Sequence, residues 1–82
     1  MKEGVHIVPE EEIRQRLGRS IRAARSARSM TQEAVAARSG MGWRHLQKIE
    51  AGEVNVTLRT ICRVATALGV DPSALLCVKG SA

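Results

Sequence analysis

Cationic side chains are the chemical groups that this sequence carries in excess. Residues 14–48 hold nine basic groups against one acid, a net charge of +8, whereas residues 1–13 carry −3 and residues 49–82 are balanced. Ten of the thirteen basic residues are arginine, whose planar fork suits phosphate and guanine edges better than lysine does. This concentration of positive charge predicts a polyanionic partner.

Metal and catalytic chemistry find little support in the sequence. Cys62 and Cys77 stand far apart and His6 and His45 are scattered, whereas zinc needs about four converging ligands. We expect Cys62 to be half-buried on a helix, Cys77 to lie near a frayed end, and neither a disulfide nor a metal site. Without a glycine-rich phosphate loop or a nucleophile–histidine pair, no enzyme and no cofactor are expected.

Length and composition restrict the class of protein further. The chain has 82 residues, 44% of them hydrophobic, with one Trp and neither Phe nor Tyr, which predicts one small domain with an aliphatic core. Base-stacking sheets are excluded because they need several exposed rings. The longest apolar run has five residues, so we expect no membrane span, no secretory signal and a cytoplasmic location.

Hydrophobic periodicity predicts an all-α domain over residues 9–78, between an extended arm (1–8) and a short tail (79–82). Helices are expected at 9–27, 32–38, 43–51, 58–68 and 73–77. Proline in the first turn and three glutamates favour the start of the first helix, and glycines end the third and fourth helices. The residues expected to point inward are Ile13, Leu17, Ile21, Ala24, Val35, Met41, Leu46, Ile49, Leu58, Ile61, Ala65 and Leu68.

The second and third predicted helices are separated by only three residues. Ala36 is small where the two helices must meet, and Gly40 occupies a turn that needs a left-handed backbone. This pattern favours a helix-turn-helix whose second helix stands clear of the body, although similar pairs also occur in ordinary bundles. Once the core positions are removed, the residues left outside on the second helix are Trp43, Arg44, Gln47, Lys48 and Ala51.

The order of these motifs resembles the lambda-repressor-like family, the Cro/cI or XRE class of helix-turn-helix proteins. The resemblance covers about residues 13–77. It is carried by Leu17-Gly18-x-x-Ile21-Arg22-x-x-Arg25, Thr31-Gln32-Glu33-x-Val35-Ala36, Ser39-Gly40, Leu46-x-x-Ile49-Glu50-x-Gly52, Asn55-x-Thr57-Leu58-x-Thr60-Ile61 and Ala67-Leu68-Gly69-Val70. It implies a compact five-helix domain that binds double-stranded DNA, similar to restriction-modification controller proteins or small phage and plasmid repressors.

The resemblance also implies roles for individual residues. Base contacts fall to Trp43, Arg44 and Lys48, with His45 and Gln47 at the margin, and Arg44 is the best candidate for a guanine contact. Arg25 and Glu50 fall at positions of a partly buried ion pair between the first and third helices. The residues implied to contact the DNA backbone are Thr31, Gln32, Arg38, Asn55, Thr57 and Arg59.

Four positions depart from the family pattern. Gly42 stands where a serine or threonine usually caps the recognition helix, so this helix has a weaker start. Trp43 is unusual as a base reader, and its ring either packs on a thymine methyl or a sugar or folds back on the protein. Ala51 and Glu53 supply no cation after the third helix, where relatives often carry one.

The leading hypothesis is a homodimeric regulator that reads a palindromic operator through half-sites about 34 Å apart. The expected dimer surface is Leu75, Leu76 and Val78, with Val5, Ile7 and Val8 as an optional addition, unless these residues only seal the monomer core or lie disordered. A protein-interaction module and an antitoxin with a toxin partner remain alternatives. The excess of arginine argues against the former and the short chain against the latter.

Overall fold

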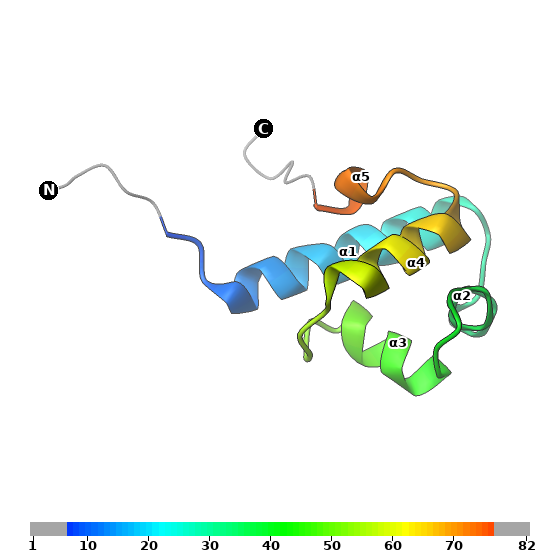
Figure 1. Ribbon diagram of the computed structural model, residues 1–82, viewed down its shortest axis with the longest axis horizontal. Coiled ribbons are helices and arrows are strands. Elements are labelled where there is room, and N and C mark those ends of the chain that lie inside the picture. The colour runs from blue at the N-terminus through cyan, green and yellow to red at the C-terminus, as the bar shows by residue number, and fades with distance from the viewer. Residues whose placement is uncertain (1–6, 77–82) are drawn as a thin grey trace, which may run out of the picture.

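The computed structural model describes residues 7–76, a part of the chain that contains helices and no β-strand (Figure 1). The helices are α1 (Glu10–Ala27), α2 (Gln32–Ser39), α3 (Trp43–Glu50), α4 (Leu58–Leu68) and α5 (Pro72–Leu76). The predicted all-α, five-helix architecture is confirmed, and the bounds of the first four helices agree with the prediction to within one residue. The expected roles of Val5, Cys77 and Val78 concern residues outside the described range.

Helix α1 is the long element against which the others pack. Pro9 is its N-cap rather than part of its first turn, and three glutamates follow it, where they interact favourably with the helix dipole. At its other end, α1 ends at Ala27, and the chain turns at Ser29, the one non-glycine residue with positive φ (54°) in the described range. The amide of Met30 donates to the carbonyl of Arg25 (3.0 Å) and closes the turn toward α2.

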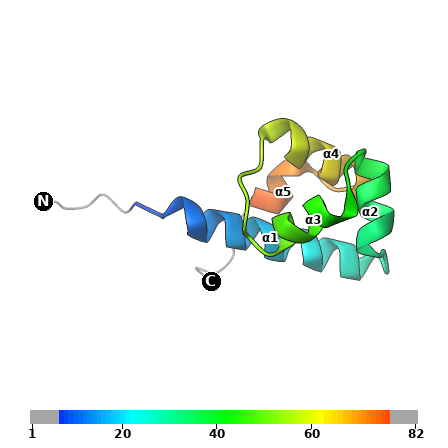
Figure 2. The ribbon, with the colours of Figure 1, turned by 90° about the horizontal axis from the view of Figure 1, so that it is seen from below.

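The core lies where α1, α2, α3 and α4 meet, and α5 closes it from the side of α1 and α4. Its largest fully buried side chains are Ile21, Val35, Leu46, Ile49, Val64 and Leu68. Helix α3 packs against α1 and α2, and its opposite face is uncovered in the view from below (Figure 2). The recognition helix of the predicted motif therefore lies at the surface of the molecule.

A glycine in the middle of α1 permits the close contact with α3. A Cβ atom built on Gly18 would stand 2.3 Å from the backbone carbonyl oxygen of Glu50 and 2.8 Å from that of Ile49. No side chain fits at such distances, and the atoms in the way are backbone. Gly18 therefore sets the spacing between the two helices and, with it, the height at which α3 stands above α1.

Four expectations about burial need correction. Leu58 is 73% exposed because it lies in the first turn of α4, beyond the reach of the helices that cover Ile61. Ile13, in the second turn of α1, is 37% exposed, and Cys62 is exposed rather than half-buried. Leu75, expected at a dimer surface, is buried within the monomer.

Helices α4 and α5 begin with side-chain caps. The Thr57 hydroxyl accepts from the amide of Thr60 (3.1 Å). Asp71 accepts from the hydroxyl of Ser73 (2.7 Å) and from its amide (2.8 Å), and these two hydrogen bonds lower the pKa of the Asp71 carboxyl. The caps fix the directions of both helices where the loops enter them.

Candidate nucleic-acid interface

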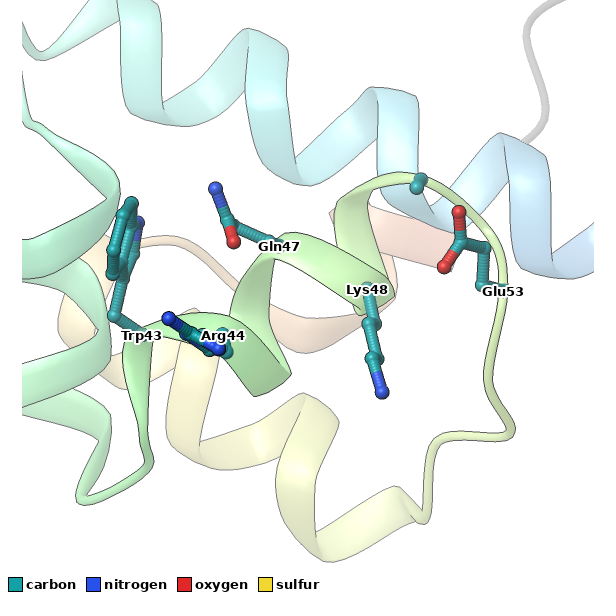
Figure 3. A pocket seen from close by; sticks show the side chains of 6 residues that line it. Trp43, Arg44, Gln47, Lys48 and Glu53 are labelled. Carbon is teal, nitrogen blue, oxygen red and sulfur yellow. The ribbon is translucent and has the colours of Figure 1, made fainter.

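The outer face of α3 carries four large or polar side chains close together. Trp43, Arg44, Gln47 and Lys48 are exposed, and with Ala51 and Glu53 they line a hollow of about 490 Å³. Figure 3 shows Trp43 at the α2 end of this row, Arg44 beside it, and Lys48 further along the helix toward Glu53. We call the side chains of Trp43, Arg44, Gln47 and Lys48 the reading face.

His45 is exposed but does not line the hollow. The structure thus brings together four of the five residues that the sequence predicted for base contact and places His45 outside the group. This separation follows from helical geometry, because positions 43, 44, 47 and 48 share one side of a helix with 3.6 residues per turn. Position 45 is rotated away from them.

The turn between α2 and α3 holds the reading face in place. Gly40 takes the left-handed conformation (φ 70°), and the amide of Met41 donates to the carbonyl of Ala36 (3.0 Å). The buried Ser39 hydroxyl donates to the carbonyl of Val35 (2.7 Å). As the sequence indicated, Gly42 begins α3 without a side-chain cap.

Behind the reading face, a buried carboxylate joins three helices. Glu50 has no exposed side-chain surface. It accepts from Arg25 of α1 through Nε (2.8 Å) and Nη2 (3.1 Å), and from Nε2 of Gln32 on α2 (2.9 Å). Arg25 also donates to the carbonyl of Met30 (3.0 Å), and Arg22 lies 3.6 Å from the same carboxylate. The ion pair implied by the family resemblance is thus the centre of a larger network.

Gln32 extends this network to the reading face. While its Nε2 donates to Glu50, its Oε1 accepts from the indole Nε1 of Trp43 (3.1 Å). The indole thus folds partly back onto the protein, although 41% of the residue remains exposed. A continuous series of hydrogen bonds runs from α1 to the first residue of α3.

The residues expected to contact a DNA backbone fall into separate groups. Thr31 caps α2 by accepting from the amide of Ala34 (3.0 Å), and Thr57 caps α4. Asn55 accepts through Oδ1 from Nη1 of Arg14 (3.3 Å), in the loop between α3 and α4. Arg14 also donates to the carbonyl of Gly52 (3.2 Å) and so fastens this loop to α1.

Arg38 and Arg59 lie together in a second hollow between α2 and α4. This hollow has a volume of about 300 Å³, and its other lining residues are Cys62, Arg63 and Thr66. Within residues 7–76, no carboxylate lies within 4.0 Å of any of its three guanidinium groups. It shares no lining residue with the hollow on α3.

Sequence reasoning missed two arginines in this arrangement. Arg63 stands four positions after Arg59, a spacing that places both on one face of α4 and was a usable signal. The link from Arg14 to the loop left no signal in the sequence, because it depends on how the loop returns to α1.

In the described residues, no group of three or more metal-ligating side chains occurs, and no helix is long and apolar enough to cross a membrane.

Known proteins resemble this chain in sequence and in fold. Residues 16–76 match the model of a helix-turn-helix domain family. An uncharacterized HTH-type transcriptional regulator, y4dJ, of Sinorhizobium fredii is 37% identical over 60 residues, which cover 73% of this chain and 78% of the relative.

Solved structures agree with this match. The restriction-modification controller protein C.AhdI of Aeromonas hydrophila is 34% identical with a TM-score of 0.74, over 76% of this chain and 94% of the controller. The hypothetical transcription factor NHTF of Neisseria is 25% identical with a TM-score of 0.81, over 98% and 92% of the two chains. Together with the five helices and the glycine turn before α3, these matches show that the chain belongs to the helix-turn-helix family of transcriptional regulators, in the lambda-repressor-like class that its motifs indicated.

Proposed function

We propose that this chain is a sequence-specific regulator that binds double-stranded DNA as a homodimer, with α3 of each copy in the major groove. The observation that carries the proposal is the division of α3 into two sides. One side is fixed by Leu46, Ile49 and the buried Glu50, whereas the other holds the reading face in the open. An exposed helix of this kind fits the major groove, where each base pair offers a distinct pattern of contacts.

The charge of this surface supports the choice of partner. The reading face contributes Arg44 and Lys48, and the first half of the chain carries the large excess of cations. Arg44 is the proposed reader of guanine, since its forked guanidinium matches two acceptors on that base. The names of the relatives describe a transcriptional regulator and a restriction-modification controller protein rather than enzymes. The proposed backbone contacts are Thr31, Gln32, Arg38, Asn55, Thr57 and Arg59. Such a protein would act in the cytoplasm, where bacterial DNA lies.

The proposed dimer surface is narrower than the sequence suggested. Because Leu75 is buried in the monomer, Leu76 remains as the exposed leucine of α5 (43%). It lines a hollow of about 320 Å³ together with Ile13, Val56 and other residues of α1 and the loop before α4. A twofold pairing through this surface would give the two reading faces the fixed separation that operator half-sites need.

Binding titrations at several salt concentrations test the function. A duplex enriched from a random pool serves as the operator, and a scrambled duplex as the control. A protein that contacts about six phosphates shows log K falling with log salt at a slope near −5. Preference for the enriched duplex supports specific binding, whereas equal weak binding to both duplexes contradicts it. Sedimentation of the complex gives the number of copies on each duplex.

Two substitutions separate base reading from backbone contact. Arg44→Ala is expected to cost about 1–3 kcal/mol on the operator and to relax the preference at one base pair. Arg59→Ala is expected to weaken binding to operator and scrambled duplex by the same factor. Equal losses on both duplexes for Arg44→Ala would remove Arg44 from the role of base reader.

A further inference from the structure

The amide of Gln32 has only one orientation that satisfies its neighbours. Glu50 is a carboxylate paired with Arg25, so it accepts hydrogen bonds and the Gln32 nitrogen must face it (2.9 Å). The Gln32 oxygen is therefore left to face the indole of Trp43 (3.1 Å). The opposite orientation would bring two oxygens together at Glu50 and two donors together at Trp43.

This arrangement decides which part of Trp43 is available to a partner. An indole has one polar hydrogen, on Nε1, and here that hydrogen is donated within the protein. Since 41% of the residue is nevertheless exposed, the indole surface left for a partner is carbon. Trp43 stands next to Arg44 in the row of side chains on α3 (Figure 3), so this apolar surface belongs to the reading face.

We propose that Trp43 reads the 5-methyl group of a pyrimidine in the major groove, with no hydrogen bond to the base. This inference rests on the proposed DNA-binding function. The thymine methyl is the one apolar group among the base edges of the major groove, and it matches a ring whose only donor is occupied. Because the contact recognises the methyl group itself, 5-methylcytosine is read at the same position, whereas uracil and cytosine are not.

The same hydrogen bonds position the indole of Trp43 for contact with a base, whereas a surface ring without them would rotate freely. Its Nε1 is tied to Gln32, and Gln32 to the fully buried Glu50. These bonds favour one position of the ring before a partner arrives, which lowers the rotational freedom that the ring would lose on contact. Gln32 acts here as a positioning residue for Trp43.

Base analogues in the enriched operator test the proposal with the wild-type protein alone. Each thymine of a half-site is replaced in turn by uracil, which lacks only the methyl group. At one position per half-site, we expect the affinity to fall about four-fold, the ratio that burial of one methyl group supports. At that position, 5-methylcytosine should bind about four-fold more tightly than cytosine. If no uracil duplex binds more weakly than the operator, the inference is wrong.

Variants then assign the effect to Trp43. The Trp43→Ala variant should bind the duplexes with uracil and with thymine at that position with equal affinity. Trp43→Ser serves the same purpose if the alanine variant does not fold. The control Ser26→Ala, on the exposed face of α1, should keep the difference. A thymine-to-uracil ratio that persists in the alanine or serine variant would assign the methyl group to another residue. If no duplex is enriched at all, the proposed function fails instead, which is a distinct outcome.

Discussion

Replacing Glu50 with glutamine removes one charge from the interior and changes its shape little. The carboxylate is fully buried and accepts three hydrogen bonds, two of them from Arg25, whose side chain is only 16% exposed. Glu50→Gln leaves that guanidinium charged and without its counter-ion. Removing one partner of a buried ion pair costs about 3–5 kcal/mol. Because Arg25 lies near the surface, we expect a loss at the lower end, about 3 kcal/mol.

Thermal and urea unfolding, followed by far-ultraviolet circular dichroism, measure this loss. For a domain of this size, each kcal/mol lowers the melting temperature by about 4–8 °C, so the expected decrease is roughly 12–24 °C. The matched control is Glu12→Gln. Glu12 lies in the first turn of α1, is 46% exposed and pairs with Arg16 four residues later. Losing that ion pair and the interaction with the helix dipole should cost at most about 1 kcal/mol.

A double substitution separates the ion pair from simple loss of packing. Arg25→Met combined with Glu50→Leu removes both charges and keeps similar volumes, so it should be clearly more stable than Glu50→Gln alone. Two results would refute this reasoning. One is a loss for Glu50→Gln no larger than that for Glu12→Gln, and the other is a double variant as unstable as the single one.

Four other predictions concern backbone geometry and caps. Gly18→Ala should destabilise the fold by about 1–3 kcal/mol in urea unfolding, despite the higher helix propensity of alanine, because its methyl group meets the backbone of α3; a neutral result would contradict the close contact. Gly42→Ser should stabilise by a few tenths of a kcal/mol, since it adds a cap to α3 in open space, and a lower melting temperature would count against this. Ser29→Gly should stabilise by about 0.5–1 kcal/mol because it relieves a positive φ, a gain that calorimetry can detect. Because folding lowers the pKa of Asp71, its ionised carboxylate stabilises the fold at pH values above its ordinary pKa of 3.8, and this stabilisation is lost as the pH falls through the folded-state pKa. Asp71→Ala should therefore reduce the loss of stability in acid, and an unchanged acid titration would contradict that role.

The local features of the fold could be predicted because they depend on neighbours in the sequence. Gly40 and Gly69 end helices with positive φ, and Thr31 and Thr57 cap the helices that follow them. Each such signal lies within a few residues of the feature that it causes. The same is true of the reading face, whose members follow from the period of a single helix.

The failures occurred where other helices decide the outcome. Leu58 has the spacing of an inward-facing residue. Periodicity predicts the side of the helix on which a residue lies, but not whether a neighbouring helix extends far enough to cover it. Leu75 and Leu76 are adjacent in a short helix, and the sequence alone does not tell which of them α1 and α4 cover. The bonds of Gln32 to Glu50 and Trp43 could not be predicted either, because they depend on three helices meeting; its predicted phosphate contact stays a prediction.

The chain contains one tryptophan, Trp43, and no tyrosine or phenylalanine. Trp43 is the first residue of α3 and donates a hydrogen bond to Gln32. The intrinsic fluorescence of the protein therefore comes from a single indole. Its emission spectrum reports the polarity and mobility of the first turn of α3 alone, with no background from other rings. The molecule thus carries a built-in optical probe at the surface where a partner is proposed to dock, and no dye has to be attached.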